Sequence, residues 1–112
     1  MLKIETTKET NYHLLQLIGE VDASNSVELD EAIIDLIEQG AKNILIDGTQ
    51  LDYISSAGLG VFMSYIEDFE EKNIALIIFG LNEKVYQVFK ILGLDHLINI
   101  KSKKVEAVQE IE

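Results

Sequence analysis

The sequence predicts an α/β domain whose central sheet is mostly parallel, with helices as crossovers. Two short runs, 44–47 and 74–79, are apolar at almost every position, which is typical of parallel strands buried on both faces. A segment with helical spacing of its apolar residues precedes each run. Strand–helix–strand units of this kind are right-handed, so the helices are expected to pack back onto the sheet.

The chain begins with two expected strands, 2–6 and 12–18, joined by a polar turn. A helix is expected next, because Asn25 and Glu28 have the spacing of a capping box. Gly40 stands where a helix is often followed by glycine. Apolar residues follow Glu28 at helical spacing and form one stripe: Leu29, Ile33, Leu36, Ile37 and Ala41.

The second half of the chain continues the alternation. A helix is expected over 57–72, then the strand 74–79, a third amphipathic helix closed by Gly93, a short strand over 97–100 and a last helix over 103–112. The helix 57–72 is expected to bury one apolar stripe and to expose its acidic residues. That stripe is Leu59, Phe62, Met63, Ile66 and Phe69.

Composition limits the function. A chain of 112 residues is the size of one domain, here 1–112. Acidic residues outnumber basic ones by 20 to 9, so the net charge of −11 disfavours nucleic acid and anionic membranes and suits a partner with a basic groove. There is no cysteine and no apolar run of membrane-spanning length, so a soluble cytoplasmic protein is expected.

The sequence offers little for catalysis. His13 and His96 lie far apart, and no cluster has the spacing of metal ligands. Gly58-Leu59-Gly60 resembles the start of a dinucleotide-binding loop, but Met63 occupies the place of its third glycine, and no lysine is positioned as in a phosphate-binding loop. We therefore expect no enzyme activity, no cofactor and no bound metal.

Asp47 directly follows an apolar run, at the edge of the sheet where α/β proteins place reactive groups. It is a candidate for the phosphorylated aspartate of a receiver domain, with Glu20 and Asp22 as metal-binding acids. The spacing disfavours this alternative, because Asp22 and Asp47 are only 25 positions apart. Phe79-Gly80 also lacks the hydroxyl residue that a receiver places after the corresponding strand.

Ser55 and Ser56 stand just before the helix 57–72. Serine is a favoured helix cap, and Ser56 is expected to be the N-cap. A hydroxyl there is exposed beside the positive end of the helix dipole, so a phosphate on it would be structurally tolerated. It would add nearly two negative charges to a neighbourhood expected to hold Asp22 and Asp47.

The chain resembles the bacterial anti-sigma factor antagonists of the STAS domain family over essentially its whole length. The resemblance rests on Gly19-Glu20-Val21-Asp22, on Ile44-Leu45-Ile46-Asp47 and on the loop from Ile54 to Gly60. The family's usual loop reads Asp-Ser-Ser/Thr-Gly-Leu-Gly, and its phosphorylated serine follows the Asp. That serine corresponds to Ser56, while Ser55 replaces the Asp and Ala57, before Gly58, replaces the second hydroxyl.

The resemblance implies a single STAS domain, a β-α superhelix with an N-terminal strand pair, and a partner-switching function. The unphosphorylated protein would bind an anti-sigma factor that is also a serine kinase of the histidine-kinase ATPase type. Phosphorylation of Ser56 would release it, and a PP2C-type phosphatase would restore binding. The protein would be a substrate and a binding module, not an enzyme.

The helix after Ser56 suggests where a partner binds. Val61, Ser64 and Tyr65 are expected on its more exposed side and are proposed as partner-binding residues.

Three alternatives remain. They are a STAS accessory subunit without phosphorylation, such as that of a lipid-transport ATPase; the receiver domain with Asp47 as acceptor; and a small enzyme or nucleotide-binding domain using the loop after the strand 44–47.

Overall fold

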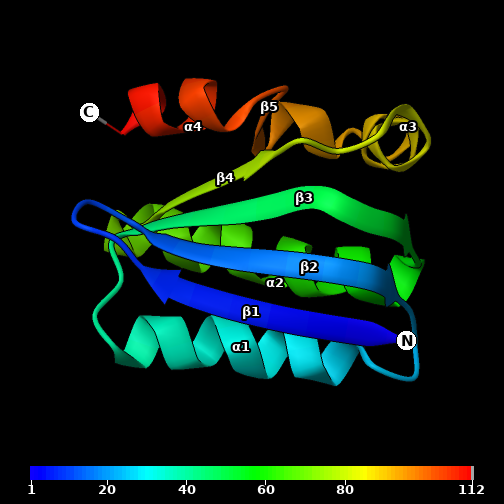
Figure 1. The fold of residues 1–112 in the computed structure, drawn as a ribbon, viewed down its shortest axis with the longest axis horizontal. Helices are drawn as coiled ribbons and strands as arrows, with labels where there is room; N and C mark the ends of the chain where they lie inside the picture. Colours follow the sequence, from blue (N-terminus) through cyan, green and yellow to red (C-terminus); the bar gives the residue numbers. More distant parts are fainter. Residues whose placement is uncertain (112) are drawn as a thin grey trace.

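The computed structural model describes residues 1–111, which form a five-stranded sheet with helices on both faces (Figure 1). The strands are β1 (Leu2–Lys8), β2 (His13–Val21), β3 (Asn43–Ile54), β4 (Ala75–Phe79) and β5 (Asn99–Lys101). The helices are α1 (Ser26–Glu38), α2 (Ser56–Lys72), α3 (Glu83–Ile91), the 3₁₀ turn η1 (Leu94–His96) and α4 (Lys104–Glu110). Within these residues, no helix combines the length and the apolar composition needed to cross a bilayer.

The strands lie side by side in chain order. β1 is antiparallel to β2, and each later strand is parallel to the one before it. The predicted fold class and the predicted N-terminal strand pair are therefore confirmed. Because the parallel strands are added in one direction, right-handed crossovers place α1, α2 and α3 on the same face of the sheet.

The larger of two apolar cores lies between the sheet and helices α1 to α3. At its centre is a tilted aromatic pair, Phe62 of α2 and Phe89 of α3, whose ring centroids are 6.2 Å apart. Aliphatic side chains of the same core include Leu29 and Ile33 of α1 and Leu59 of α2. This core therefore joins the three crossover helices to one face of the sheet.

The smaller core lies on the opposite face of the sheet. There Ala107 of α4 packs with Leu45 of β3 and with Ile77 and Phe79 of β4. Alternate residues of β3 and β4 point to the two faces. The apolar runs 44–47 and 74–79 therefore face a core on each side, as their composition predicted.

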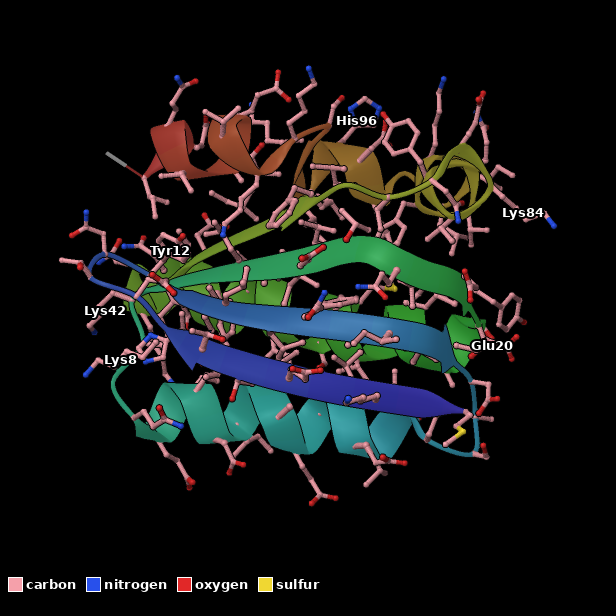
Figure 2. All side chains as sticks on the ribbon, viewed as in Figure 1. Lys8, Tyr12, Glu20, Lys42, Lys84 and His96 are labelled. Carbon is pink, nitrogen blue, oxygen red and sulfur yellow. The ribbon has the colours of Figure 1, made fainter. Side chains whose placement is uncertain are left out.

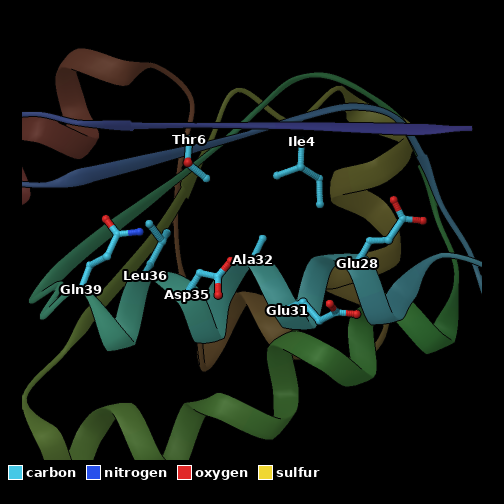
Figure 3. Close-up of a pocket in the computed structure, with 8 residues that line it drawn as sticks. All are labelled: Ile4, Thr6, Glu28, Glu31, Ala32, Asp35, Leu36 and Gln39. Carbon is cyan, nitrogen blue, oxygen red and sulfur yellow. The ribbon is translucent and has the colours of Figure 1, made fainter.

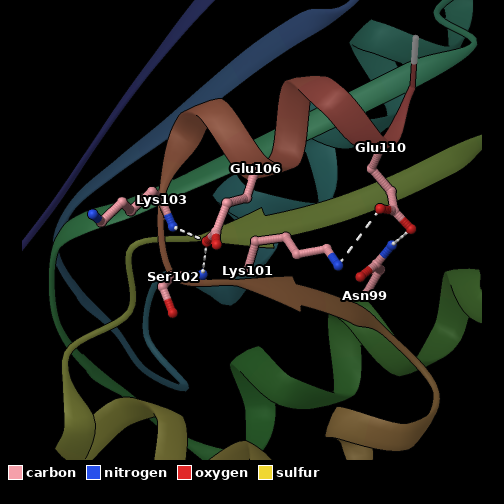
Figure 4. Close-up of polar contacts among 6 residues, drawn as sticks. All are labelled: Asn99, Lys101, Ser102, Lys103, Glu106 and Glu110. Carbon is pink, nitrogen blue, oxygen red and sulfur yellow. Dashed lines mark hydrogen bonds and ion pairs between the residues drawn. The ribbon is translucent and has the colours of Figure 1, made fainter.

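Polar contacts fix the start and the end of α4 (Figure 4). At the start, one carboxylate oxygen of Glu106 accepts hydrogen bonds from the backbone N–H groups of Lys103 at 3.0 Å and Ser102 at 3.2 Å. At the end, Glu110 accepts a hydrogen bond from Asn99 at 3.0 Å and lies 3.5 Å from the Lys101 ammonium group. The Asn99 hydrogen bond, followed by the charge of Lys101, lowers the pKa of Glu110. The predicted last helix is confirmed up to Glu110, and residue 112 lies outside the described residues.

β3 is much longer than the apolar run that predicted it. It continues past Asp47 to Ile54, because β2 extends alongside it and pairs with it as far as Val21. The apolar run did not predict this extension, because exposed polar residues interrupt it: Thr49, Gln50 and Asp52. Asp47 therefore lies inside a strand, level with Phe79 at the end of β4, and not at the end of β3.

The start of α1 differs from the prediction. Asn25 occupies the N-cap position, but its side chain makes no hydrogen bond to the helix, so the predicted capping box with Glu28 is wrong. The side chain instead binds the loop before the helix. The end of α1 agrees with the prediction, since Gly40 follows it with a φ of 84°, a conformation that favours glycine.

The buried stripe of α2 is only partly as predicted. Leu59, Phe62 and Phe69 are buried and Ile66 is half-buried, but Met63 is 49% exposed. α2 packs against α1 on one side and against α3 on the other, so its buried face includes the side toward α1. Val61 and Tyr65 occupy that side and pack against the main core, while Met63 faces solvent.

Candidate functional site

The two serines lie where β3 meets α2. Ser55 has an extended backbone, with φ −88° and ψ 173°, and its hydroxyl accepts a hydrogen bond from the backbone N–H of Gly58 at 3.4 Å. Ser55 is therefore the N-cap, and the prediction that Ser56 caps the helix is wrong. The backbone N–H of Ser55 also donates to the carbonyl of Val21 at 2.9 Å, which holds this junction against the end of β2.

Ser56 is the first residue of α2, and it is exposed. Because Ser55 caps the helix, the hydroxyl of Ser56 is not needed for capping. The first turn of α2 contains no acidic residue. Added negative charge at Ser56 would therefore meet the positive end of the helix dipole without a competing carboxylate in that turn.

The two glycines after Ser56 have different surroundings. A Cβ atom on Gly58 would lie 2.6 Å from Cγ1 of Val21 and 2.8 Å from Cγ1 of Ile54, so α2 can approach β2 and β3 here only because this residue has no side chain. A Cβ atom on Gly60 would meet nothing within 4 Å, and Gly60 is exposed. The packing of the domain thus requires Gly58 but gives no reason for Gly60.

Asp22 and Ser55 are the residues that directly follow the paired ends of β2 and β3, Val21 and Ile54. The Asp22 carboxylate accepts hydrogen bonds from the backbone N–H of Ser24 at 2.9 Å and from the Ser24 hydroxyl at 2.5 Å. The bond from the hydroxyl, followed by that from the backbone, lowers the pKa of Asp22, so it carries its negative charge at neutral pH. The charged carboxylate of Asp22 is therefore bound to Ser24, in the loop that follows the end of β2 paired with Ile54.

Asn25 shapes the loop that carries Asp22. It is 7% exposed, its side-chain oxygen accepts from the backbone N–H of Asp22 at 2.9 Å, and its side-chain amide donates to the carbonyl of Glu20 at 3.0 Å. Both bonds cross the turn between β2 and α1. The residue expected to cap a helix therefore holds the β2–α1 loop next to the end of β3.

Asp47 is not a neighbour of Ser56, contrary to the prediction. It pairs with Gln16, whereas Ile54 pairs with Val21, five residues further along β2, so the two residues of β3 are about 17 Å apart at some 3.3 Å per residue. Its carboxylate accepts hydrogen bonds from the backbone N–H of Thr49 at 2.9 Å and from the Thr49 hydroxyl at 2.7 Å. Residues 1–111 contain no group of three His, Cys, Asp or Glu side chains arranged to hold a metal ion, so Glu20, Asp22 and Asp47 do not form the acidic cluster that the receiver alternative requires.

The three residues predicted to bind a partner differ in exposure. Ser64 is exposed, and its hydroxyl donates to the carbonyl of Val61 at 2.6 Å. Val61 and Tyr65 are half-buried against the main core. The Tyr65 hydroxyl donates to a carboxylate oxygen of Asp30 in α1 at 2.5 Å, and the Tyr65 ring lies 5.2 Å from that of Phe69. Tyr65 therefore connects α1 to α2, and the expectation that it lies on the exposed side is wrong.

Comparison with known proteins assigns the fold to a family. The family model for the STAS domain matches residues 3–107. The chain belongs to the STAS domain family. Two curated relatives of this STAS domain are both named anti-sigma-B factor antagonist: that of Staphylococcus aureus (strain NCTC 8325 / PS 47), 27% identical over 88% of this chain and 92% of the relative, and that of Listeria monocytogenes serovar 1/2a, 30% identical over 85% and 83%.

Solved structures support the same fold. The anti-sigma factor antagonist SpoIIAA in its unphosphorylated form matches this STAS domain with a TM-score of 0.81 at 20% identity, over 97% of this chain and 96% of that chain. The structure of Bacillus SpoIIAA in its phosphorylated form matches with a TM-score of 0.74 at 20% identity, over 98% and 100%. At this level of identity the likeness concerns the fold.

Helices α1 and α2 and strand β3 expose three large apolar side chains for which the sequence predicted no exposed role. Val27 is 65% exposed in the first turn of α1, Tyr53 is 49% exposed near the end of β3, and Met63 is exposed on α2. The spacing of apolar residues could not identify them, because each stands close to buried residues in the sequence. The exposure of Met63 follows from the rotation of α2 that buries Val61 and Tyr65.

The Tyr65–Asp30 contact gives a prediction for stability. Burial, then the hydrogen bond to Asp30 and the charges of nearby acids, raise the pKa of Tyr65 well above its usual range. A raised pKa means that the contribution to stability is complete below about pH 10, where tyrosine in the unfolded chain is protonated, and is lost as the pH rises further. Tyr65→Phe should lower the free energy of unfolding by about 1–2 kcal/mol at pH 7, and this difference should shrink above about pH 10.

Urea unfolding at neutral pH and at a pH just above the usual tyrosine pKa measures both values. Tyr53→Phe is the matched control, since Tyr53 is exposed, and it should leave both values close to those of the wild type. A Tyr65→Phe variant as stable as the wild type at neutral pH would contradict the assigned hydrogen bond.

Proposed function

We propose that this STAS domain is an anti-sigma factor antagonist controlled by phosphorylation of Ser56. In the cytoplasm, the unmodified protein binds an anti-sigma factor that is also a serine kinase of the histidine-kinase ATPase type. Phosphorylation of Ser56 ends that binding, and a PP2C-type phosphatase restores it. The names of the two curated relatives support the class of partner.

One observation carries the proposal. Ser56 presents an exposed hydroxyl at the first residue of α2, while Ser55 caps the helix. A kinase can reach this hydroxyl without unfolding the domain, and a phosphate there is compatible with the helix dipole. The modification therefore changes the charge of the surface and leaves the fold intact.

The partner surface proposed here follows the exposed side of α2. Its residues recur at helical spacing from the phosphorylation site and are all exposed: Ser56, Gly60, Met63 and Ser64. Met63 supplies an apolar contact, and Gly60 leaves room for the partner's backbone. Val61 and Tyr65 support this surface from below, because both pack against the core.

The two glycines provide a paired prediction. Gly60→Ala should stabilise the fold by up to about 1 kcal/mol, because alanine favours a helix and the new methyl group meets nothing. It should nevertheless weaken partner binding, because the methyl group lies on the proposed contact. Gly58→Ala should destabilise the fold by about 1–3 kcal/mol through its contacts with Val21 and Ile54.

Thermal unfolding and calorimetric binding of the two variants check this pair. A Gly60→Ala variant that binds as tightly as the wild type would exclude Gly60 from the contact. A Gly58→Ala variant of unchanged stability would show that the helix can move away from the sheet at little cost.

The proposal is tested with a candidate anti-sigma factor of the histidine-kinase ATPase type from the same genome. We expect calorimetry to show binding in the presence of ADP. After incubation with ATP and magnesium, intact mass should show one added phosphate, and binding should be lost. Binding that persists while the mass stays unchanged would favour an accessory subunit without phosphorylation, and no binding to any such ATPase would contradict the proposal.

A further inference from the structure

β1 is an edge strand with unpaired backbone groups along its outer side. The backbone N–H of Glu20 donates to the carbonyl of Met1 at 3.0 Å, and that of Glu9 donates to the carbonyl of Tyr12 at 2.8 Å. In an antiparallel pair, the backbone groups of every second residue bond to the partner strand. The backbone N–H and C=O groups of the odd-numbered residues of β1 therefore point toward β2. The peptide groups of Leu2, Ile4 and Thr6 therefore point away from the sheet.

A groove of about 380 Å³ runs below this edge, between β1 and α1 (Figure 3). The side chains of Ile4 and Thr6 point from β1 toward α1, and Ala32 and Leu36 of α1 form the apolar part of the opposite wall. The residues that line the groove are Ile4, Thr6, Glu28, Glu31, Ala32, Asp35, Leu36 and Gln39. Extended peptides add a strand to a sheet where unpaired backbone groups of an edge strand lie beside a groove lined by apolar side chains.

Every charged residue that lines the groove is acidic. These residues are Glu28, Glu31 and Asp35, and α1 as a whole carries five acidic residues and no lysine or arginine. The lysines labelled at the sheet in Figure 2, Lys8 and Lys42, lie toward the end opposite Glu20. A basic ligand in the groove would therefore meet attractive negative charge along most of its length.

The spacing of the acids matches that of an extended chain. Glu31 and Asp35 are four residues apart in a helix, which corresponds to about 6 Å along its axis at 1.5 Å per residue. Alternate residues of a strand are about 6.6 Å apart and point to the same face. Two basic side chains at alternate positions of an added strand can thus face Glu31 and Asp35 together.

We propose that the β1 edge and the groove below it bind an extended basic segment of another protein, with lysine or arginine at alternate positions. The segment pairs its backbone with the outward groups of β1 and directs its basic side chains to the acids of α1. A second copy of this chain is a less suitable occupant, because two chains of net charge −11 repel each other. α1 lies between the groove and α2 in Figure 3, so the inference does not depend on Ser56.

Nuclear magnetic resonance of the isotopically labelled chain tests this inference with a short synthetic peptide that alternates lysine with valine. The amides of Ile4 and Thr6 should shift during the titration and exchange more slowly with solvent. The variant E31K/D35K should bind the peptide at least about tenfold more weakly, because attraction becomes repulsion. The variant E67K/E71K is the matched control, with a similar charge change at the same spacing on exposed positions of α2, and should bind as the wild type does.

Two further measurements separate strand addition from simple charge attraction. A peptide N-methylated at alternate residues, on the side that would pair with β1, should fail to bind. Equal binding of this peptide, or equal weakening by both charge variants, would overturn the proposal. Sedimentation of the chain alone should show a monomer, and a dimer lost on mutation of the β1 edge would assign the groove to a second copy instead.

Discussion

Phosphorylation of Ser56 is expected to weaken the complex with the anti-sigma factor by about a hundredfold or more, which corresponds to about 2.7 kcal/mol. A phosphate adds nearly two negative charges at neutral pH. The phosphate would be added at the end of the sheet where β2 is followed by Asp22, whose pKa is lowered by hydrogen bonds from Ser24. Uncompensated charge inside a contact formed by the neutral protein can cost several kcal/mol.

Variants at the two serines check this expectation by calorimetry. Ser56→Ala should bind the partner and resist phosphorylation. Ser56→Asp should weaken binding less than phosphate does, because it adds one charge. Ser55→Ala should lower stability through loss of the helix cap, by about 1 kcal/mol, and leave binding of the folded protein nearly unchanged. Tight binding of the Ser56-phosphorylated protein would contradict the electrostatic explanation.

Phe62→Ala is expected to lower the free energy of unfolding by about 3–5 kcal/mol. Phe62 is 1% exposed, and its ring packs against Phe89 of α3. Removal of the ring would leave a cavity between α2 and α3 and lose the aromatic contact. Urea unfolding measures the difference.

The neighbouring residue provides the control. Met63→Ala should change stability by less than about 1 kcal/mol, because half of Met63 is exposed to solvent. Comparable losses from the two substitutions would mean that α2 is rotated relative to the structure described.

Strands that are buried against a core on both faces could be predicted from the sequence. The runs 44–47 and 74–79 face a core on both sides, and their composition alone indicates parallel strands. The extension of β3 to Ile54 could not be predicted in the same way, because its buried residues alternate irregularly with exposed polar ones. That extension places Asp47 far from the site.

The site itself could be predicted in part. Asp22 and Ser55 follow the paired ends of β2 and β3, so the two motifs lie at one end of the sheet, while the proximity of Asp22 to Ser56 stays a prediction. The predicted cap is wrong, because serine at either position can cap a helix and only the backbone conformation of Ser55 decides between them. The predicted exposure of Tyr65 is wrong because its partner, Asp30, lies 35 residues earlier in the chain.

The most direct test of the central claim is to locate the phosphate. The chain is incubated with ATP and its cognate kinase, digested, and analysed by fragmentation mass spectrometry. We predict one phosphate on Ser56 and none on the Ser56→Ala variant. A phosphate on Ser55, or stoichiometric modification of Ser56→Ala, would contradict the account.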